Sequence, residues 1–226
     1  TSVSQDEAVV VVTDDQGEDH PRIPYGFVYI LDAPTSGMVR KGDDPLSYIN
    51  KDQNYNLRLE FRPKDQYHGP KSQIVKSVIM LEFHDKSNPV DALGRWHFWH
   101  QQQPSPKVRA LVVAQKESVG LVAPVEELAY NAVKVYWNPT ESPANISIAV
   151  YCLSTDFSPQ KGVKGIPLHF QIDTYEDDQS QGGAPTITDR AYCQIKVFCD
   201  KGAERKSREE EKRVLRYRQQ GREGIK

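Results

Sequence analysis

Long hydrophobic runs are absent from this sequence, and no stretch approaches the roughly 18 consecutive apolar residues that a membrane-spanning helix requires. The N-terminus also lacks the basic and apolar regions of a secretory signal peptide. Cysteine is scarce: the 226 residues include only Cys152, Cys193 and Cys199, an odd number without paired spacing. This pattern argues against a disulfide framework and indicates a reducing compartment.

Signatures of common enzymes and metal sites are missing as well. There is no G-x-S-x-G motif, no Walker-type phosphate loop and no H-E-x-x-H motif. His97 and His100 stand three residues apart, but no Cys-x-x-Cys pair accompanies them to complete a zinc site. We expect Trp96 and Trp99 to be buried there while the histidines face solvent. The sequence therefore predicts no enzyme, no metal, no cofactor and no small-molecule substrate.

Charge is unevenly distributed along the chain, although the net charge is only −2. Residues 196–226 contain 11 Lys and Arg against 6 Asp and Glu, a balance of +5, so residues 1–195 carry −7. A cationic end in an otherwise acidic chain suggests a polyanionic partner, with nucleic acid first among the candidates. On charge alone, a solvated charged tail is the favoured explanation of the asymmetry.

Short apolar segments separated by Gly, Pro, Asn and Asp dominate the chain from residue 25 onward. In many of them apolar and polar residues alternate, which is typical of strands with one buried face. Eight strands with intervening turn signals predict a single all-β, Greek-key sandwich. The predicted strands are residues 26–31, 55–61, 75–83, 107–113, 133–137, 146–153, 168–173 and 193–198.

Helices are predicted only at residues 91–102, 125–131 and 203–220. The last is rich in helix formers and has Glu–Arg pairs at i,i+4 spacing, but it has few apolar residues to bury, so we expect a helix on the surface that a partner fixes in place. Residues 1–22 hold six acidic residues against one arginine and have little to bury. We therefore divide the chain into a flexible acidic arm at 1–24, a sandwich domain at 25–208 and a charged helical extension at 209–226.

Two segments have the composition of DNA-contacting elements. In the loop 160–165, glycines allow a close backbone approach and Lys161 and Lys164 supply charge for phosphates or guanine edges. In the strand–turn–helix segment 198–208, Arg205 and Arg208 share one helical face, and arginine can bind guanine O6 and N7 together in the major groove. The alternatives are an ordinary hairpin and a solvated helix whose charges pair among themselves.

These same segments carry a family resemblance. The sequences CLSTDF at 152–157, QKGVKG at 160–165 and RAYCQIKVFCDKGAERK at 190–206 resemble the grainyhead branch of the grainyhead/CP2 transcription factors. The likeness covers about residues 27–208 and is weakest at 57–72 and 176–188. Ser207 stands where the family pattern leads us to expect an apolar residue.

The resemblance implies an immunoglobulin-like fold akin to the p53 core domain, in a nuclear transcription factor. Its expected partner is double-stranded DNA with a palindromic CCGG-centred site, which two copies of the chain bind as a two-fold pair. Without DNA, the chain is expected to be a monomer or a weak dimer. Carried over by position, the expected DNA-binding residues are Lys161, Gly162, Lys164, Cys199, Arg205, Lys206 and Arg208. Arg205 is the expected guanine reader. The competing hypothesis is a β-sandwich interaction module whose basic helix binds an acidic protein partner.

Overall fold

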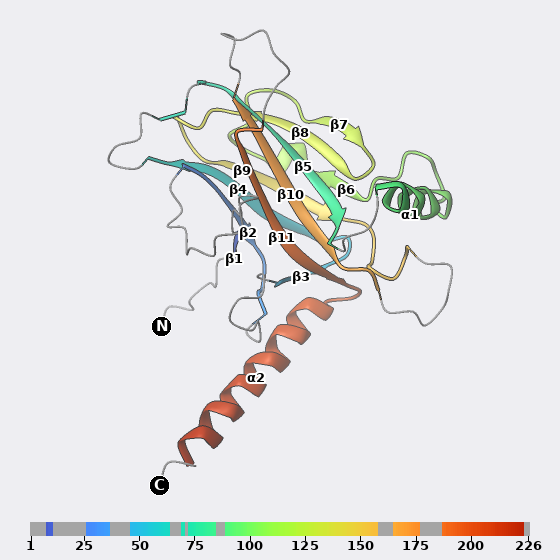
Figure 1. Ribbon diagram of the computed structural model, residues 1–226, viewed down its shortest axis with the longest axis vertical. Coiled ribbons are helices and arrows are strands. Elements are labelled where there is room, and N and C mark those ends of the chain that lie inside the picture. The colour runs from blue at the N-terminus through green and yellow to red at the C-terminus, as the bar shows by residue number, and fades with distance from the viewer. Residues whose placement is uncertain are drawn as a thin grey trace.

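The computed structural model describes residues 8–10, 26–36, 46–63, 69–70, 72–84, 89–157, 165–176 and 187–223. Two sheets pack face to face, and a long C-terminal helix leaves the sandwich at one end (Figure 1). In spatial order, the first sheet contains β1 (Ala8–Val10), β2 (Gly26–Asp32), β4 (Asn54–Arg62), β9 (Ala144–Val150) and β6 (Leu111–Val113). The second contains β3 (Leu46–Asn50), β11 (Asp189–Phe198), β10 (Leu168–Glu176), β5 (Val75–Phe83), β8 (Ala132–Trp137) and β7 (Glu126–Ala129).

Within the described residues, the remaining elements are two α-helices and one short 3-10 helix. They are α1 (Pro89–Gln101), η1 (Gln115–Glu117) and α2 (Gly202–Glu223). Among the described strands all pairings are antiparallel except that of β3 with β11, which is parallel. This parallel pair matters for the site, because it places the end of β3 beside the end of β11, where α2 begins.

The core lies between the two sheets and follows from the period-2 alternation of the strands. In β5 every second residue from Val75 to Phe83 is buried, and the residues between them are half-buried on the other face. Trp137, Leu59 and Ile79 are fully buried between the sheets. The all-β sandwich predicted from the sequence is confirmed, and each of the eight predicted strands has a counterpart. The strand predicted at 75–83 coincides with β5, and the other seven differ at one or both ends.

The predicted helix at 125–131 is wrong. Residues Glu126–Ala129 form the edge strand β7, which pairs antiparallel with β8. The side chain of Asn131 in the connecting turn donates to the carbonyl oxygen of Leu81 at 3.0 Å. Pairing with β8 outweighs helix propensity here, because a helix of two turns without a buried face is not stable by itself. The strand β3 was not among the eight predicted strands.

Helix α1 is held to the sandwich by two tryptophans, as expected from the sequence. Trp96 and Trp99 are buried, and His97 is exposed. His100 differs from the prediction, because it is half-buried and stacks on Tyr130 with ring centroids 4.8 Å apart. Within the described residues no group of three or more side chains is arranged to hold a metal ion. None of the described helices has the length and hydrophobicity to cross a membrane.

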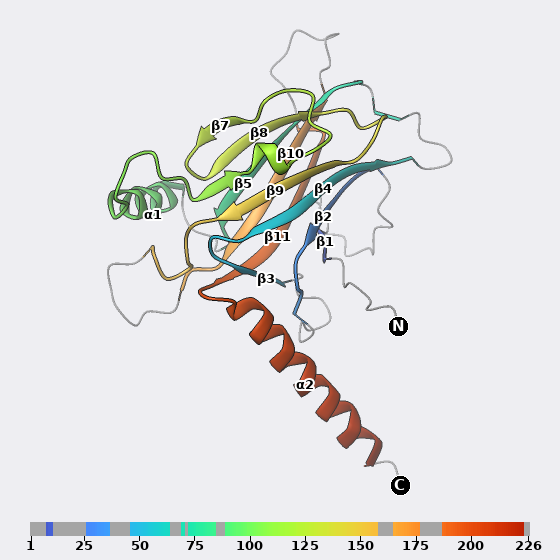
Figure 2. The ribbon, with the colours of Figure 1, turned by 180° about the vertical axis from the view of Figure 1, so that it is seen from behind.

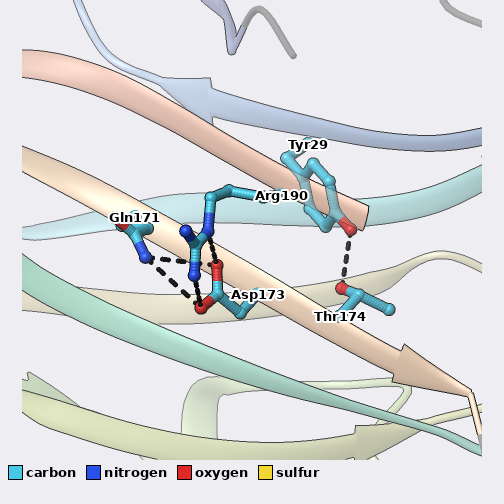
Figure 3. A network of polar contacts seen from close by, with 5 residues as sticks. All are labelled: Tyr29, Gln171, Asp173, Thr174 and Arg190. Carbon is cyan, nitrogen blue, oxygen red and sulfur yellow. Dashed lines mark hydrogen bonds and ion pairs between the residues drawn. The ribbon is translucent and has the colours of Figure 1, made fainter. Parts of the chain in front are cut away.

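A buried chain of hydroxyl groups links the two sheets. The hydroxyl of Tyr29 on β2 donates to the Thr174 hydroxyl on β10 at 2.6 Å (Figure 3). The Thr174 oxygen lies 2.7 Å from the Ser77 hydroxyl, which accepts a bond from the Trp137 indole at 3.0 Å. Burial raises the pKa of Tyr29 well above its usual range, so the phenol remains a neutral donor.

Beside this chain, an ion pair lies on the outer face of the second sheet. The Arg190 guanidinium on β11 contacts both carboxylate oxygens of Asp173 on β10, each at 2.7 Å, and Gln171 donates to the same carboxylate (Figure 3). Asp173 and Arg190 are direct cross-strand partners. The fork-shaped contact therefore stabilises the register of β10 against β11, the strand that ends at α2.

Replacing Thr174 with valine is expected to lower the free energy of unfolding by about 1–3 kcal/mol, because Tyr29 and Ser77 lose a buried partner with little change in shape. Urea denaturation measures this as a lower midpoint with an unchanged slope. Thr174→Ser keeps the hydroxyl and serves as the control. A Thr174→Val variant as stable as the Thr174→Ser variant would contradict the importance of the hydroxyl chain.

Candidate nucleic-acid interface

A tight turn connects β11 to α2. The backbone at Asp200 and Lys201 is left-handed, with φ angles of 47° and 55°, and Gly202 N donates to the Cys199 carbonyl oxygen at 3.0 Å. A Cβ atom on Gly202 would lie only 2.8 Å from Cβ of Phe198. Glycine at this position therefore lets the first turn of the helix pack directly against the end of the strand.

Asn50, the last residue of β3, caps the N-terminus of α2 from another element. Its Oδ1 accepts a hydrogen bond from the backbone N of Ala203 at 2.9 Å, and its Nδ2 donates to both carboxylate oxygens of Glu204, at 3.0 and 2.9 Å. Because the first N–H groups of a helix have no partner within the helix, Asn50 performs the role of a capping side chain. Its own backbone N donates to the Tyr55 hydroxyl at 2.8 Å, which holds Asn50 in place.

Glu210 forms a second anchor two turns further along α2. Although only 6 % exposed, its carboxylate accepts hydrogen bonds from the Tyr48 hydroxyl at 2.7 Å and the Ser36 hydroxyl at 2.8 Å. Lys206, one turn earlier on the helix, lies 3.2 Å from the same carboxylate. Two separate points of attachment, at Asn50 and Glu210, thus determine the direction in which α2 leaves the sandwich (Figures 1 and 2).

Both anchors depend on ionised carboxylates. Hydrogen bonds from Asn50 lower the pKa of Glu204 below its ordinary 4.5, against an opposing effect of burial. Burial alone would raise the pKa of Glu210, but hydrogen bonds from Tyr48, Ser36 and Lys206 outweigh it, so this pKa is also lowered. Burial and the bond to Glu210 raise the pKa of Tyr48 to about 12, so Tyr48 stays a donor.

The attachment of α2 is therefore expected to weaken in acid. A carboxyl whose pKa is lower in the folded state stabilises fully above its ordinary pKa of 4.5 and loses that contribution as the pH falls through the lowered value. The free energy of unfolding of the wild-type protein and of the double variant Glu204→Gln/Glu210→Gln is measured by denaturation from about pH 6 to about pH 3. It should fall less steeply with decreasing pH in the variant. An equally steep fall in both proteins would contradict the assignment.

The structure separates the predicted DNA-binding residues into three groups. Cys199, Arg205 and Arg208 are exposed around the turn and the first turns of α2. Lys206 is half-buried and paired with Glu210, so its amino group takes part in the second anchor. The others, Lys161, Gly162 and Lys164, lie outside the described residues.

The described residues that follow the loop 160–165 lie at the end of the sandwich from which α2 leaves. A Cβ atom on Gly165 would lie 2.8 Å from the Ser154 side chain, and Ile166 N donates to the Ser154 carbonyl oxygen at 2.9 Å. Strand β10 then begins at Leu168, which pairs with Ile195 near the end of β11. The segment after the loop 160–165 and the segment before α2 therefore lie together at one end of the second sheet.

Sequence reasoning did not identify Asn50, Glu210, Tyr48 or Ser36 as parts of this site. Asn50 and Glu204 are 154 residues apart in the sequence, and no local pattern connects them. The available signal was indirect, because residues 47–51 lie within the region, about residues 27–208, that the family resemblance covers.

The architecture is that of a p53-like, immunoglobulin-like β-sandwich with a basic helix at the end of its last strand. The solved structure of Cep-1, the C. elegans ortholog of human p53, is similar to it with a TM-score of 0.52 and 10 % sequence identity. This similarity covers 80 % of this chain and 89 % of the Cep-1 chain. At this identity the likeness concerns the fold alone.

The chain belongs to the CP2 transcription factor family, whose model matches residues 2–220. It is 53 % identical over 191 residues to Protein grainyhead of Drosophila melanogaster, covering 84 % of this chain and 14 % of that protein. It is 48 % identical over 196 residues to Grainyhead-like protein 1 homolog of Caenorhabditis elegans, covering 86 % and 34 %. It is 46 % identical over 197 residues to Grainyhead-like protein 2 homolog of Homo sapiens, covering 86 % of this chain and 31 % of that protein.

The resemblance seen in the sequence motifs is thus confirmed, and the chain spans about a third or less of the length of these curated relatives. The family is one of transcription factors, which are not enzymes.

Proposed function

We propose that this chain is the part of a nuclear transcription factor that binds double-stranded DNA in a sequence-specific manner. The observation that carries the proposal is the fixed presentation of Arg205 and Arg208, which are exposed on a helix held at two points by Asn50 and Glu210. An α-helix fits the major groove, and a guanidinium can bind both O6 and N7 of guanine there. A firmly held helix is suited to this task, because base readout depends on the position of the side chain.

The proposed site is a palindrome centred on CCGG, bound by two copies of the chain related by a two-fold axis. Each copy would present α2 to one half-site, with Arg205 on a guanine and Arg208 on a second base or a phosphate. The exposed Cys199 lies at the turn that leads into the helix, where a small side chain permits a close approach to the DNA backbone. Two-fold symmetry of the protein pair would be mirrored in the palindrome.

The pairing is tested by titrating duplexes that carry two half-sites or only one and measuring the mass of each complex. Two copies on the full palindrome and one copy on the half-site duplex are the expected results. Unlabelled duplexes with single changes in CCGG should compete less well, with each mismatch costing about 1–3 kcal/mol. A single copy on the full palindrome would contradict pairing, and equal competition by all duplexes would contradict specificity.

The loop 160–165 is proposed to contact the phosphates beside the same half-site. Replacing Lys161 with alanine is expected to weaken binding to all duplexes equally and to make the slope of log affinity against log salt shallower by about 1. The charge of Lys161 would neutralise one phosphate, and its loss would remove one released counterion. An unchanged slope in salt titrations of the variant would exclude Lys161 from the phosphate contacts.

A further inference from the structure

The cationic residues of α2 continue on one face well beyond the two anchors. Arg205, Arg208, Lys212 and Arg216, which we call the outer stripe, are all exposed. At 3.6 residues per turn they lie within about 80° of one another around the helix axis. The anchored face of the helix, with the buried Ala203 and Glu210, is on the other side.

The outer stripe is not neutralised by the helix itself. Arg208 and Arg216 direct their Nε atoms to the backbone carbonyl oxygens of Glu204 and Lys212, at 3.3 Å each. Lys206, by contrast, forms an ion pair with Glu210. Among the residues that the structure describes, no member of the outer stripe forms an ion pair, although the Glu204 carboxylate attracts Arg208 electrostatically. The exposed Lys212 and Arg216 are therefore available to an external anion.

The second half of α2 also lacks support from the sandwich. After Glu210 the described side chains are exposed, apart from the half-buried Val214, and Leu215 and Tyr217 are 56 % and 62 % exposed. Both views show this part of the helix extending into solvent (Figures 1 and 2). A helical segment without tertiary packing is only marginally stable in water, so a bound partner would stabilise it.

Helix geometry assigns the two ends of the outer stripe to different parts of DNA. With a rise of 1.5 Å per residue, Lys212 and Arg216 lie about 10 and 16 Å along the axis from Arg205. The major groove is only about 12 Å wide, so a helix that crosses it with Arg205 at the bases carries its distal residues to the groove edge and beyond. Phosphates line that edge.

We propose that Lys212 and Arg216 bind the phosphate backbone flanking the site that Arg205 reads, so that the distal half of α2 is a phosphate clamp. This inference rests on the proposed function and adds to it a division of labour along one helix. The proximal cations supply sequence discrimination, while the distal cations supply affinity that is independent of sequence. The occupant is the DNA duplex itself, whose charge complements the unpaired outer stripe.

The test compares salt titrations of the wild-type protein, Lys212→Gln, Arg216→Gln and the double variant, on a CCGG-centred duplex and a scrambled duplex. Glutamine preserves helix propensity and removes only the charge. Each substitution should make the slope of log affinity against log salt shallower by about 0.9, and the double variant by about twice that, on both duplexes. The ratio of affinities for the two duplexes should remain that of the wild-type protein.

Arg213→Gln is the matched control, because Arg213 is an exposed cation of the same helix outside the outer stripe. If its slope changes as much as that of Arg216→Gln, the effect is one of net charge and the clamp is refuted. The clamp is equally refuted if the wild-type protein prefers the CCGG duplex but the double variant keeps its slope. If the wild-type protein binds the CCGG duplex and the scrambled duplex equally well, the proposed function is refuted instead. The salt slopes of the variants then still show whether Lys212 and Arg216 bind phosphates.

Amide hydrogen exchange supplies a readout that does not depend on affinity. Protection of the backbone amides of residues 211–217 should rise when the CCGG duplex is added, and the rise should be smaller in the double variant at saturating DNA. Protection that stays the same on DNA binding would overturn the proposal.

Discussion

Replacing Arg205 with alanine is expected to abolish the preference for the CCGG palindrome while leaving the protein folded. Arg205 is an exposed residue of α2, and substitutions at exposed positions change stability little. A bidentate arginine–guanine pair contributes about 1–3 kcal/mol of discrimination, and a two-fold pair of chains would lose it in both half-sites. Fluorescence anisotropy with palindromic and scrambled duplexes measures the loss directly.

Arg205→Lys is the control for this experiment, because it keeps the charge but cannot form the same fork of hydrogen bonds. We expect the lysine variant to lose most of the preference while retaining the wild-type salt slope. If Arg205→Ala loses affinity equally on palindromic and scrambled DNA, Arg205 contacts only phosphates. That result would assign base readout to another residue.

Replacing Asn50 with alanine is expected to weaken specific DNA binding, although Asn50 is buried at the N-terminus of α2 and is not exposed to DNA. The change removes the partner of the Ala203 backbone N and of the Glu204 carboxylate. Loss of a helix cap and of buried hydrogen bonds should lower the free energy of unfolding by about 1–3 kcal/mol. The first turn of α2 would then be less well held, and binding would require it to be ordered again.

Gln53→Ala is the matched control for Asn50→Ala, because it removes only a peripheral hydrogen bond of 2.8 Å to the Asn50 side chain. Urea denaturation and anisotropy, both at a temperature where each variant is folded, should show a large effect for Asn50→Ala and a small one for Gln53→Ala. A destabilised Asn50→Ala variant that keeps full specific affinity would show that this cap does not position the helix for DNA.

The strands were predictable because burial of one face leaves a period-2 pattern in the sequence. Strand β5 is a clear case, since alternate residues from Val75 to Phe83 are buried. The segment Glu126–Ala129 was misassigned because its residues have good helix propensity, whereas its conformation is determined by pairing with β8. Local patterns report local preference and cannot report which strand lies alongside.

The position of α2 was predictable, but the means by which it is held was not. Its composition and the charge of residues 196–226 predict an exposed basic helix, and α2 begins at Gly202, next to the expected start. The attachment through Asn50 depends on the parallel pairing of β3 with β11, which joins segments about 150 residues apart. Lys206, grouped with the DNA-binding residues by position, is paired with Glu210 in the structure.

The measurement that tests the central claim most directly is the anisotropy of a labelled CCGG-centred duplex titrated with the wild-type protein. A scrambled duplex of equal length is titrated in parallel, and both are measured at two salt concentrations. Sequence-specific recognition predicts a preference on the order of 10³-fold for the palindrome, within the range of specific DNA-binding proteins. Equal, salt-sensitive binding to both duplexes would contradict it and would reduce α2 to a cationic surface for polyanions.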